Sequence, residues 1–149
     1  MALKTKYIVW EDKYKTGYKR IDEQHIELIK IINNLYNCLE HKSDGEIYIQ
    51  NAFKDALKKT VDYVAYHFSY EEKIMHAIKY DRILEHSSYH RDFTQNIFEY
   101  VKSYENGSLD DINNLIVYLK NWLLNHILVM DKEFVREVKD KLKKISDEE

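Results

Sequence analysis

The stretch from Val64 to His76, VAYHFSYEEKIMH, has the apolar periodicity of an amphipathic helix but carries polar side chains on its apolar face. His67 and Glu71 fall on the same side as Val64 and Met75, because residues three or four positions apart share one face of a helix. A helix that directs an imidazole and a carboxylate towards a protein interior must supply partners for both. The meaning of this pair therefore depends on where the other histidines fall.

The composition is typical of a single globular domain built from helices. The chain has 149 residues, of which 44% are hydrophobic and 33% are charged, and this is enough for one domain, residues 1–149, with a packed core. It contains no proline and only three glycines, so long uninterrupted helices are expected. The formal net charge of −3 comes from interspersed charges and offers no basic patch for nucleic acid.

A single cysteine, Cys38, rules out an internal disulfide, a cysteine-based zinc site and an iron–sulfur cluster. The first residues, MALKTKYIVWEDKYK, are broken by lysines and do not resemble a signal peptide. No segment has about 18 consecutive apolar residues, so no membrane span is expected. These features predict a cytoplasmic protein.

Apolar residues recur at spacings of three and four and predict four helices, at residues 22–40, 46–77, 82–104 and 109–130. Four helices of similar length with short connections favour an all-α, antiparallel, up-down four-helix bundle over residues 22–130.

Two further segments flank this bundle. Residues 1–20 are expected to form an N-terminal arm that packs across it through Trp10 and Tyr14. Residues 132–149 are expected to form a short, charged C-terminal helix or tail.

Five of the seven histidines lie on the predicted inner faces: His25, His67, His86, His90 and His126. In an antiparallel bundle these residues, with Glu71 and Asp131, lie roughly 25–39 Å from the same end, at a rise of 1.5 Å per residue. The remaining two, His41 and His76, are expected on the surface. The alternative is a helix bundle with incidental core histidines, but each unpaired buried polar group would cost about 1–3 kcal/mol.

A bound metal would compensate for such a buried polar cluster. The pairs His67/Glu71 and His86/His90 are each spaced i, i+4, so each pair can bind one centre. Seven ligands are too many for one tetrahedral zinc ion and suit two metals bridged by a carboxylate. Nitrogen and oxygen donors without thiolate fit iron, and the donor type is also compatible with zinc, manganese or cobalt.

Asp131 follows His126 by five positions, which on an ideal α-helix would direct the two side chains about 140° apart. Both side chains can face inward if the helix widens locally to a π-type turn, a feature often found at functional sites. The spacing therefore predicts a distortion between these two residues.

Four segments together resemble the hemerythrin family, specifically its bacterial hemerythrin-like members. They are QHIEL around His25, HFSYEEKIM around His67, HSSYHRDF around His86 and WLLNHILVMD around His126, with Trp10 and the IDEQH segment fitting the N-terminal pattern. A single HxxxE or HxxxH motif occurs by chance on many helices. All four segments in order cover nearly the whole chain and are highly specific.

The resemblance implies a non-haem di-iron centre that binds dioxygen reversibly, with two iron ions per chain joined by an oxo or hydroxo bridge. By position, His86, His90 and His126 would bind one iron, and His25 and His67 the other. Glu71 and Asp131 would bridge the pair, and the second iron would keep one free coordination position for dioxygen.

We also expect an apolar oxygen-pocket wall near the ligands, although plain core packing would use the same residues. The candidates are Leu28, Phe68, Ile74, Met75, Phe93, Leu123 and Ile127.

The favoured function is oxygen storage, delivery or sensing by a binding protein, with no catalytic residues, rather than by an enzyme. A di-iron peroxidase, oxidase or nitric oxide detoxifying enzyme, or an iron reservoir, would use the same site. The resemblance names dioxygen as the partner and leaves open which protein partner or electron donor would serve the centre.

Overall fold

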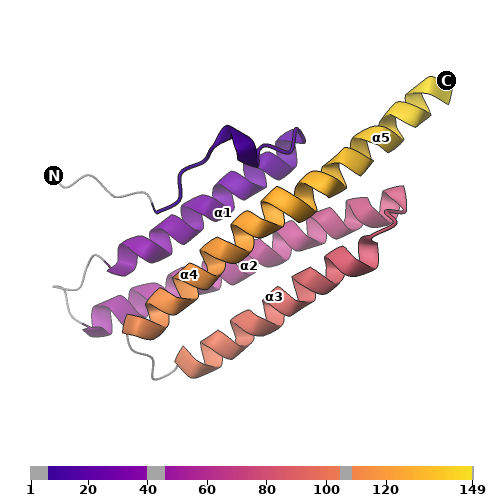
Figure 1. The fold of residues 1–149 in the computed structure, drawn as a ribbon. Coiled ribbons are helices and arrows are strands. Elements are labelled where there is room, and N and C mark those ends of the chain that lie inside the picture. Colours follow the sequence, from indigo (N-terminus) through magenta and orange to yellow (C-terminus); the bar gives the residue numbers. More distant parts are fainter. Residues whose placement is uncertain (1–6, 40–45, 105–108, 149) are drawn as a thin grey trace.

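The computed structural model describes residues 7–39, 46–104 and 109–148. Its order is a 3-10 turn at Asp12–Tyr14, then α1 (Lys19–Cys38), α2 (Glu46–Ile78), α3 (Ile83–Tyr104), α4 (Leu109–Asn125), a π-helix η3 (His126–Asp131) and α5 (Lys132–Glu148). Each of the four long rods contacts two neighbours, in the cyclic order α1, α2, α3 and α4 (Figure 1). This arrangement confirms the all-α four-helix bundle, and the described parts of the chain contain no strand.

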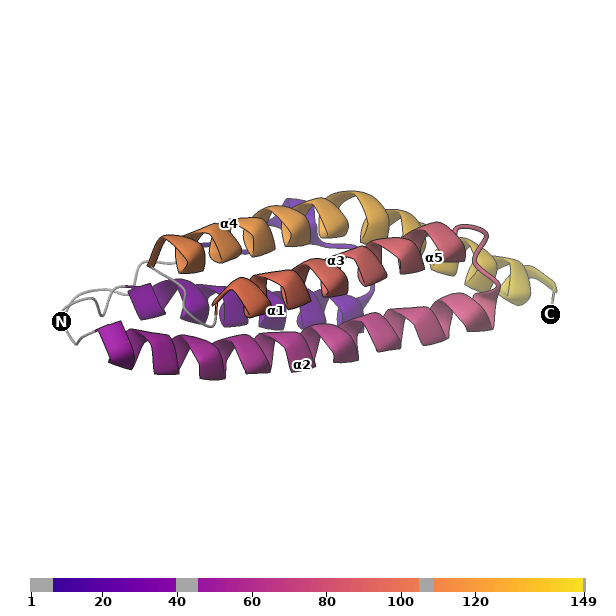
Figure 2. The same ribbon diagram turned by 90° about the horizontal axis from the view of Figure 1, so that it is seen from below.

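The fourth rod is longer than the sequence suggested. α4, η3 and α5 follow one another without a break and form one rod from Leu109 to Glu148, so the C-terminal helix of 17 residues is not short. Its far end extends beyond the other helices in both views (Figures 1 and 2). Lys141 anchors this segment, since its Nζ donates to the carbonyl oxygens of Ile78 (2.6 Å) and Lys79 (3.2 Å) at the end of α2.

The N-terminal arm packs against the bundle, as expected. Ile8 and Tyr14 are buried, and Trp10 is half-buried against the main core. Asn33 on α1 holds the arm, because its Oδ1 accepts from the Ile8 amide (2.7 Å) and its Nδ2 donates to the Ile8 carbonyl (2.9 Å). The arm is therefore fixed to α1 and contributes to the core.

A tight turn without proline or glycine joins α2 to α3. Lys79 has φ 54°, and the Tyr80 amide donates to the Met75 carbonyl (2.9 Å) while the Lys79 amide donates to that of His76 (3.2 Å). These two bonds form a Schellman motif, which satisfies the last carbonyls of a helix through one residue in the left-handed region. The turn reverses the chain and sets the start of α3 beside the end of α2.

The core consists of two apolar clusters. The larger runs through the bundle and includes Phe53, Leu115 and Leu119, while the smaller gathers Ile21, Met75, Tyr80, Phe134, Val135 and Val138 near the α2–α3 turn and α5. Across the described parts of the chain, no helix has both the length and the apolar character needed to span a membrane. The cytoplasmic location stays a prediction.

Candidate metal centre

A layer of polar side chains separates the two apolar clusters. On α1, His25 lies between Ile21 of the smaller cluster and Leu28 of the larger one, and on α2, Glu71 lies in the same way between Met75 and Phe68. The polar layer is therefore enclosed by hydrocarbon along the bundle.

All seven residues that the sequence selected lie in this layer and are buried, with between 0% and 3% of each exposed: His25, His67, Glu71, His86, His90, His126 and Asp131. By contrast, His76 is exposed as predicted. His41 lies outside the described residues.

The π-helix that the five-residue spacing predicted is present. Residues His126–Asp131 form η3, and the amide of Lys132 donates to the carbonyl of Ile127, five residues earlier. The wider turn directs His126 and Asp131 inward together, and their Nε2 and Oδ1 atoms are 2.9 Å apart. Without this widening, the two side chains would leave the helix on different sides.

The donor atoms form two sets that share Glu71. One set joins Glu71 with His86, His90 and His126, and the other joins it with His25, His67 and Asp131, with each set's donor atoms within 4.8 Å of one another. Ligands that surround one cation at about 2.1 Å and at right angles lie roughly 3 Å from one another. The spacings in both sets are close to this value, so each set can surround one cation after small side-chain movements.

The two carboxylates lie where bridging groups would be needed. Oε1 of Glu71 is 3.3 Å from Nε2 of His67 in one set and 3.4 Å from Nε2 of His90 in the other. Asp131 spans the sets through its two oxygens: Oδ2 is 2.6 Å from Nε2 of His25, while Oδ1 is 3.2 Å from Nε2 of His86. Each carboxylate therefore faces both sets.

Many polar atoms of the layer have no hydrogen-bond partner within the protein. They include Oε2 of Glu71, Oδ1 of Asp131, Nε2 of His67 and both ring nitrogens of His86, whose short contacts with one another lack hydrogen-bond geometry. Buried polar groups are normally paired, and each unsatisfied one is costly. Unpaired nitrogen and oxygen atoms that converge in two groups fit a pair of cations, and this donor set of imidazoles and carboxylates suits iron.

The electrostatics of the protein chain alone lead to the same conclusion. Burial opposes protonation of His67, but the carboxylates of Glu71 and Asp131 outweigh it and raise its pKa to about 10. The same balance raises the pKa of His86 to about 9. Conversely, burial works against ionisation of Glu71 and Asp131, yet the surrounding imidazoles hold the pKa of both carboxyls well below the usual range. Without metal, protonated histidines therefore balance the charge of the two carboxylates, and bound cations would take over this role.

Three neighbours of the ligands were not singled out from the sequence. Gln24 is buried, and its Oε1 accepts a hydrogen bond of 2.7 Å from Nδ1 of His67, which leaves Nε2 of that ring free to bind a metal. The indole of Trp122 stacks on His126, with ring centroids 4.5 Å apart, and Oε1 of Glu72 lies 3.8 Å from Nδ1 of His90. The i, i+4 spacing of Trp122 and His126 in the sequence could have predicted the contact between these two rings.

The predicted pocket-wall residues divide between the two apolar clusters. Ile74 and Met75 belong to the smaller cluster, and Leu28, Phe68, Phe93, Leu123 and Ile127 belong to the larger. The ring of Phe68 stacks on His90 at 3.8 Å between centroids, nearly parallel to it. The role of the seven residues as an oxygen pocket stays a prediction.

The fold and the site together define a helix-bundle protein with a buried histidine–carboxylate donor set. Residues 16–138 match the model of the hemerythrin HHE cation binding domain, and the chain belongs to the hemerythrin family. It is 29% identical to a bacteriohemerythrin of Pseudomonas aeruginosa strain LESB58, over 93% of this chain and 86% of that protein. It is 32% identical to a myohemerythrin of Riftia pachyptila, over 85% of this chain and 89% of that protein.

Proposed function

We propose that this protein binds dioxygen reversibly at a non-haem centre of two iron ions joined by an oxo or hydroxo bridge. The observation that carries the proposal is the buried layer of seven donors, which forms two sets around the shared Glu71. Membership of the hemerythrin family supports it, since the matching domain is described as cation binding and the relatives are named as hemerythrins.

The protein chain would distribute its donors unequally between the two ions. His86, His90 and His126 would hold one ion, and His25 and His67 the other, with Glu71 and Asp131 shared. One ion therefore receives one protein ligand fewer than the other, and this difference leaves it a position for a small ligand. When bound, the iron pair would supply the electrons for reversible dioxygen binding.

The surroundings of the layer favour binding over further reaction. Apolar clusters on both sides exclude water from the donors, and Gln24 fixes the orientation of the His67 ring through its hydrogen bond. The donor set is rich in imidazole, with only two carboxylates, so the loaded centre keeps a positive charge that disfavours high-valent iron. We infer an oxygen-binding protein used for storage, delivery or sensing rather than an enzyme.

Repeated oxygenation tests this function directly. The purified protein is analysed for iron, reduced without oxygen, and followed by visible spectroscopy through cycles of oxygenation and evacuation. A coloured adduct that forms and disappears in step with oxygen is expected, with about two irons per chain by metal analysis. Immediate irreversible oxidation with substrate turnover would indicate an enzyme instead, and iron bound without an oxygen response would indicate a reservoir.

Replacement of Glu71 tests the shared carboxylate. Glu71→Ala should remove one or both irons, because both donor sets lose a member. Asp55→Ala, which removes an exposed carboxylate from the same helix outside both donor sets, is the matched control and should keep two irons. A Glu71→Ala protein that retains a normal iron pair would contradict the bridging role.

A further inference from the structure

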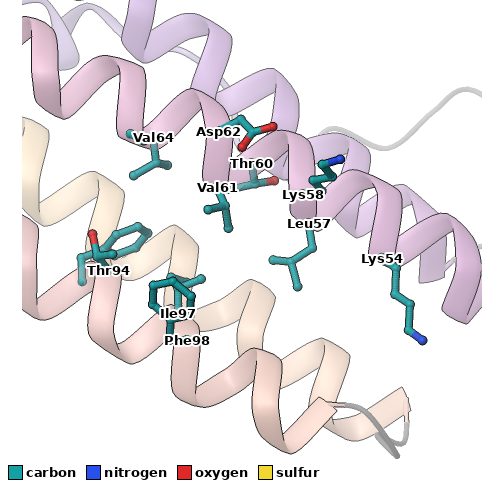
Figure 3. A pocket seen from close by; sticks show the side chains of 12 residues that line it. Lys54, Leu57, Lys58, Thr60, Val61, Asp62, Val64, Thr94, Ile97 and Phe98 are labelled. Atoms are coloured by element: carbon teal, nitrogen blue, oxygen red, sulfur yellow. The ribbon is translucent and has the colours of Figure 1, made fainter.

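An apolar groove of about 430 Å³ lies between α2 and α3, a size that is typical of sites for small molecules. Leu57, Val61 and Val64 line it from α2, and Phe93, Ile97 and Phe98 line it from α3. Figure 3 shows Leu57 and Val61 directed across the groove towards Ile97 and Phe98. None of the seven donors of the metal centre lines this groove.

The groove is open to solvent and continues towards the metal centre. Phe98, which lies at the edge of the groove, is 60% exposed. A second hollow of about 460 Å³ shares Ala65, Thr94 and Phe98 with the first and reaches Phe68 and His90. Exposed apolar surface that is continuous with a hollow of this size marks a ligand site more often than an isolated exposed ring does.

The charges along the groove favour an anionic head group at one end. Lys54 and Lys58 both line it, against a single acidic residue, Asp62. In Figure 3 the ammonium of Lys54 lies at the end of the groove that is far from Thr94. From Lys54 to Ala65 the helix rises roughly 17 Å, a length comparable with an extended dodecyl chain. An apolar slot of that length with an ammonium at one end is complementary to an aliphatic carboxylate.

We propose that this groove binds a free fatty acid of medium chain length. The carboxylate lies beside Lys54, and the aliphatic chain lies between α2 and α3 and points towards Ala65 and Thr94. The site is independent of the proposed oxygen function, since it uses none of the seven donors.

Isothermal titration calorimetry tests the proposal on the full-length protein with its metal as purified. The titrant is dodecanoate below its micelle concentration, and saturable binding to about one site per chain is expected. Absence of saturable binding would overturn the proposal. Binding of anionic phospholipid vesicles without binding of monomeric dodecanoate would also overturn it, since the groove would then recognise a membrane surface.

A substitution that fills the groove locates the site. Ala65 is exposed and lines both hollows, so Ala65→Leu places a larger side chain in the groove without disturbing the core. The affinity for dodecanoate should fall roughly tenfold or more, because the added side chain displaces part of the buried chain. Ala77→Leu, an exposed position on the same helix outside the groove, is the control and should leave the affinity unchanged. Equal affinities in these two variants would place binding elsewhere.

Removal of one positive charge tests the orientation of the ligand. Lys54→Ala should weaken dodecanoate binding roughly two- to fivefold, as expected for an exposed ion pair, and should leave dodecan-1-ol binding unchanged. Lys73→Ala removes the same charge from an exposed position of α2 outside the groove and should change neither. An equal loss for the acid and the alcohol would contradict a carboxylate contact at Lys54.

Discussion

Two stretches of the same bundle fill equivalent inward positions in opposite ways. In the larger apolar cluster, the inward positions hold hydrocarbon side chains such as Phe53, Leu115 and Leu119, which are almost completely buried. In the polar layer, the inward positions hold His67, Glu71 and five further polar residues, several of whose atoms lack hydrogen-bond partners. The first stretch stabilises the fold by burial alone, whereas the second needs protons or cations to be tolerated.

This difference indicates that the bundle and its site have separate energetic origins. Burial of large apolar side chains contributes favourably without any ligand, but buried charges are retained at a cost unless they are compensated. A fold that depended on the polar layer would collapse when the layer lost its cations. We expect instead that the apolar stretch holds the bundle and that the polar layer is kept for binding.

Truncation of Phe53 should have the largest effect on stability. Phe53→Ala leaves a cavity in the apolar stretch and should lower the free energy of unfolding by about 3–5 kcal/mol, as measured by urea denaturation, with and without metal. Iron content should stay unchanged. Phe98→Ala is the exposed control and should cost less than about 1 kcal/mol. A small loss of stability together with loss of iron would mean that the two stretches are not separate.

Apolar replacement within the polar layer should act in the opposite direction. The double variant His67→Leu/Glu71→Met removes a buried imidazole and a buried carboxylate that lie 3.3 Å apart. In the metal-free protein the free energy of unfolding should rise by about 1–4 kcal/mol, as for other buried ion pairs replaced by hydrocarbon, while iron binding is lost. A metal-free variant that is less stable than the parent would show that the polar layer supports the fold.

The hydrogen bond from His67 to Gln24 should affect both metal affinity and stability. Gln24→Leu removes the acceptor for Nδ1 of His67 and should lower metal affinity about 10- to 100-fold, as measured by competition with a chelator. The free energy of unfolding should also fall by about 1–3 kcal/mol, since Nδ1 of the buried His67 is left without its acceptor. Gln24→Glu keeps the acceptor and should retain the affinity. Equal losses in both variants would contradict an orienting role.

The pH dependence of the metal-free protein should show the most gradual effect, because it extends over several pH units. The pKa values of His67, about 10, and His86, about 9, are raised above the ordinary value of 6.5. The folded state therefore binds more protons between pH 6.5 and pH 10, and this contribution to stability is complete below pH 6.5 and is lost as the pH rises through 9 to 10. Urea denaturation of chelated protein should show this decline.

Two controls separate this decline from general alkaline unfolding. Metal-loaded protein should show it less, because cations replace the protons. The double variant His67→Leu/Glu71→Met should also show a flatter profile, since it lacks one of the two raised groups. A decline of the same size in all three proteins would assign it to groups outside the polar layer. On the acid side, burial lowers the pKa of His25 and His90, so their protonation opposes folding as the pH falls below 6.5.

The sequence by itself determined the bundle and the identity of its inward polar side chains. Apolar spacing sets which face of each helix is buried, and His67 with Glu71, or His86 with His90, share a face by helical geometry alone. Even the π-helix followed from one local fact, the five-residue spacing of His126 and Asp131, which no regular α-helix can accommodate with both side chains inward.

Only the tertiary structure decided how these side chains meet. Whether Asp131 faces both donor sets, and whether Gln24 reaches the far nitrogen of His67, depends on the rotation and height of neighbouring helices, which no single helix's periodicity specifies. The continuous rod from α4 to α5 was likewise decided by tertiary structure. Phe134, Val135 and Val138 of α5 gain apolar partners only when α1 and α2 lie beside them. The spacing of residues along one helix determines the directions of its side chains, whereas the contacts between helices depend on how the helices pack.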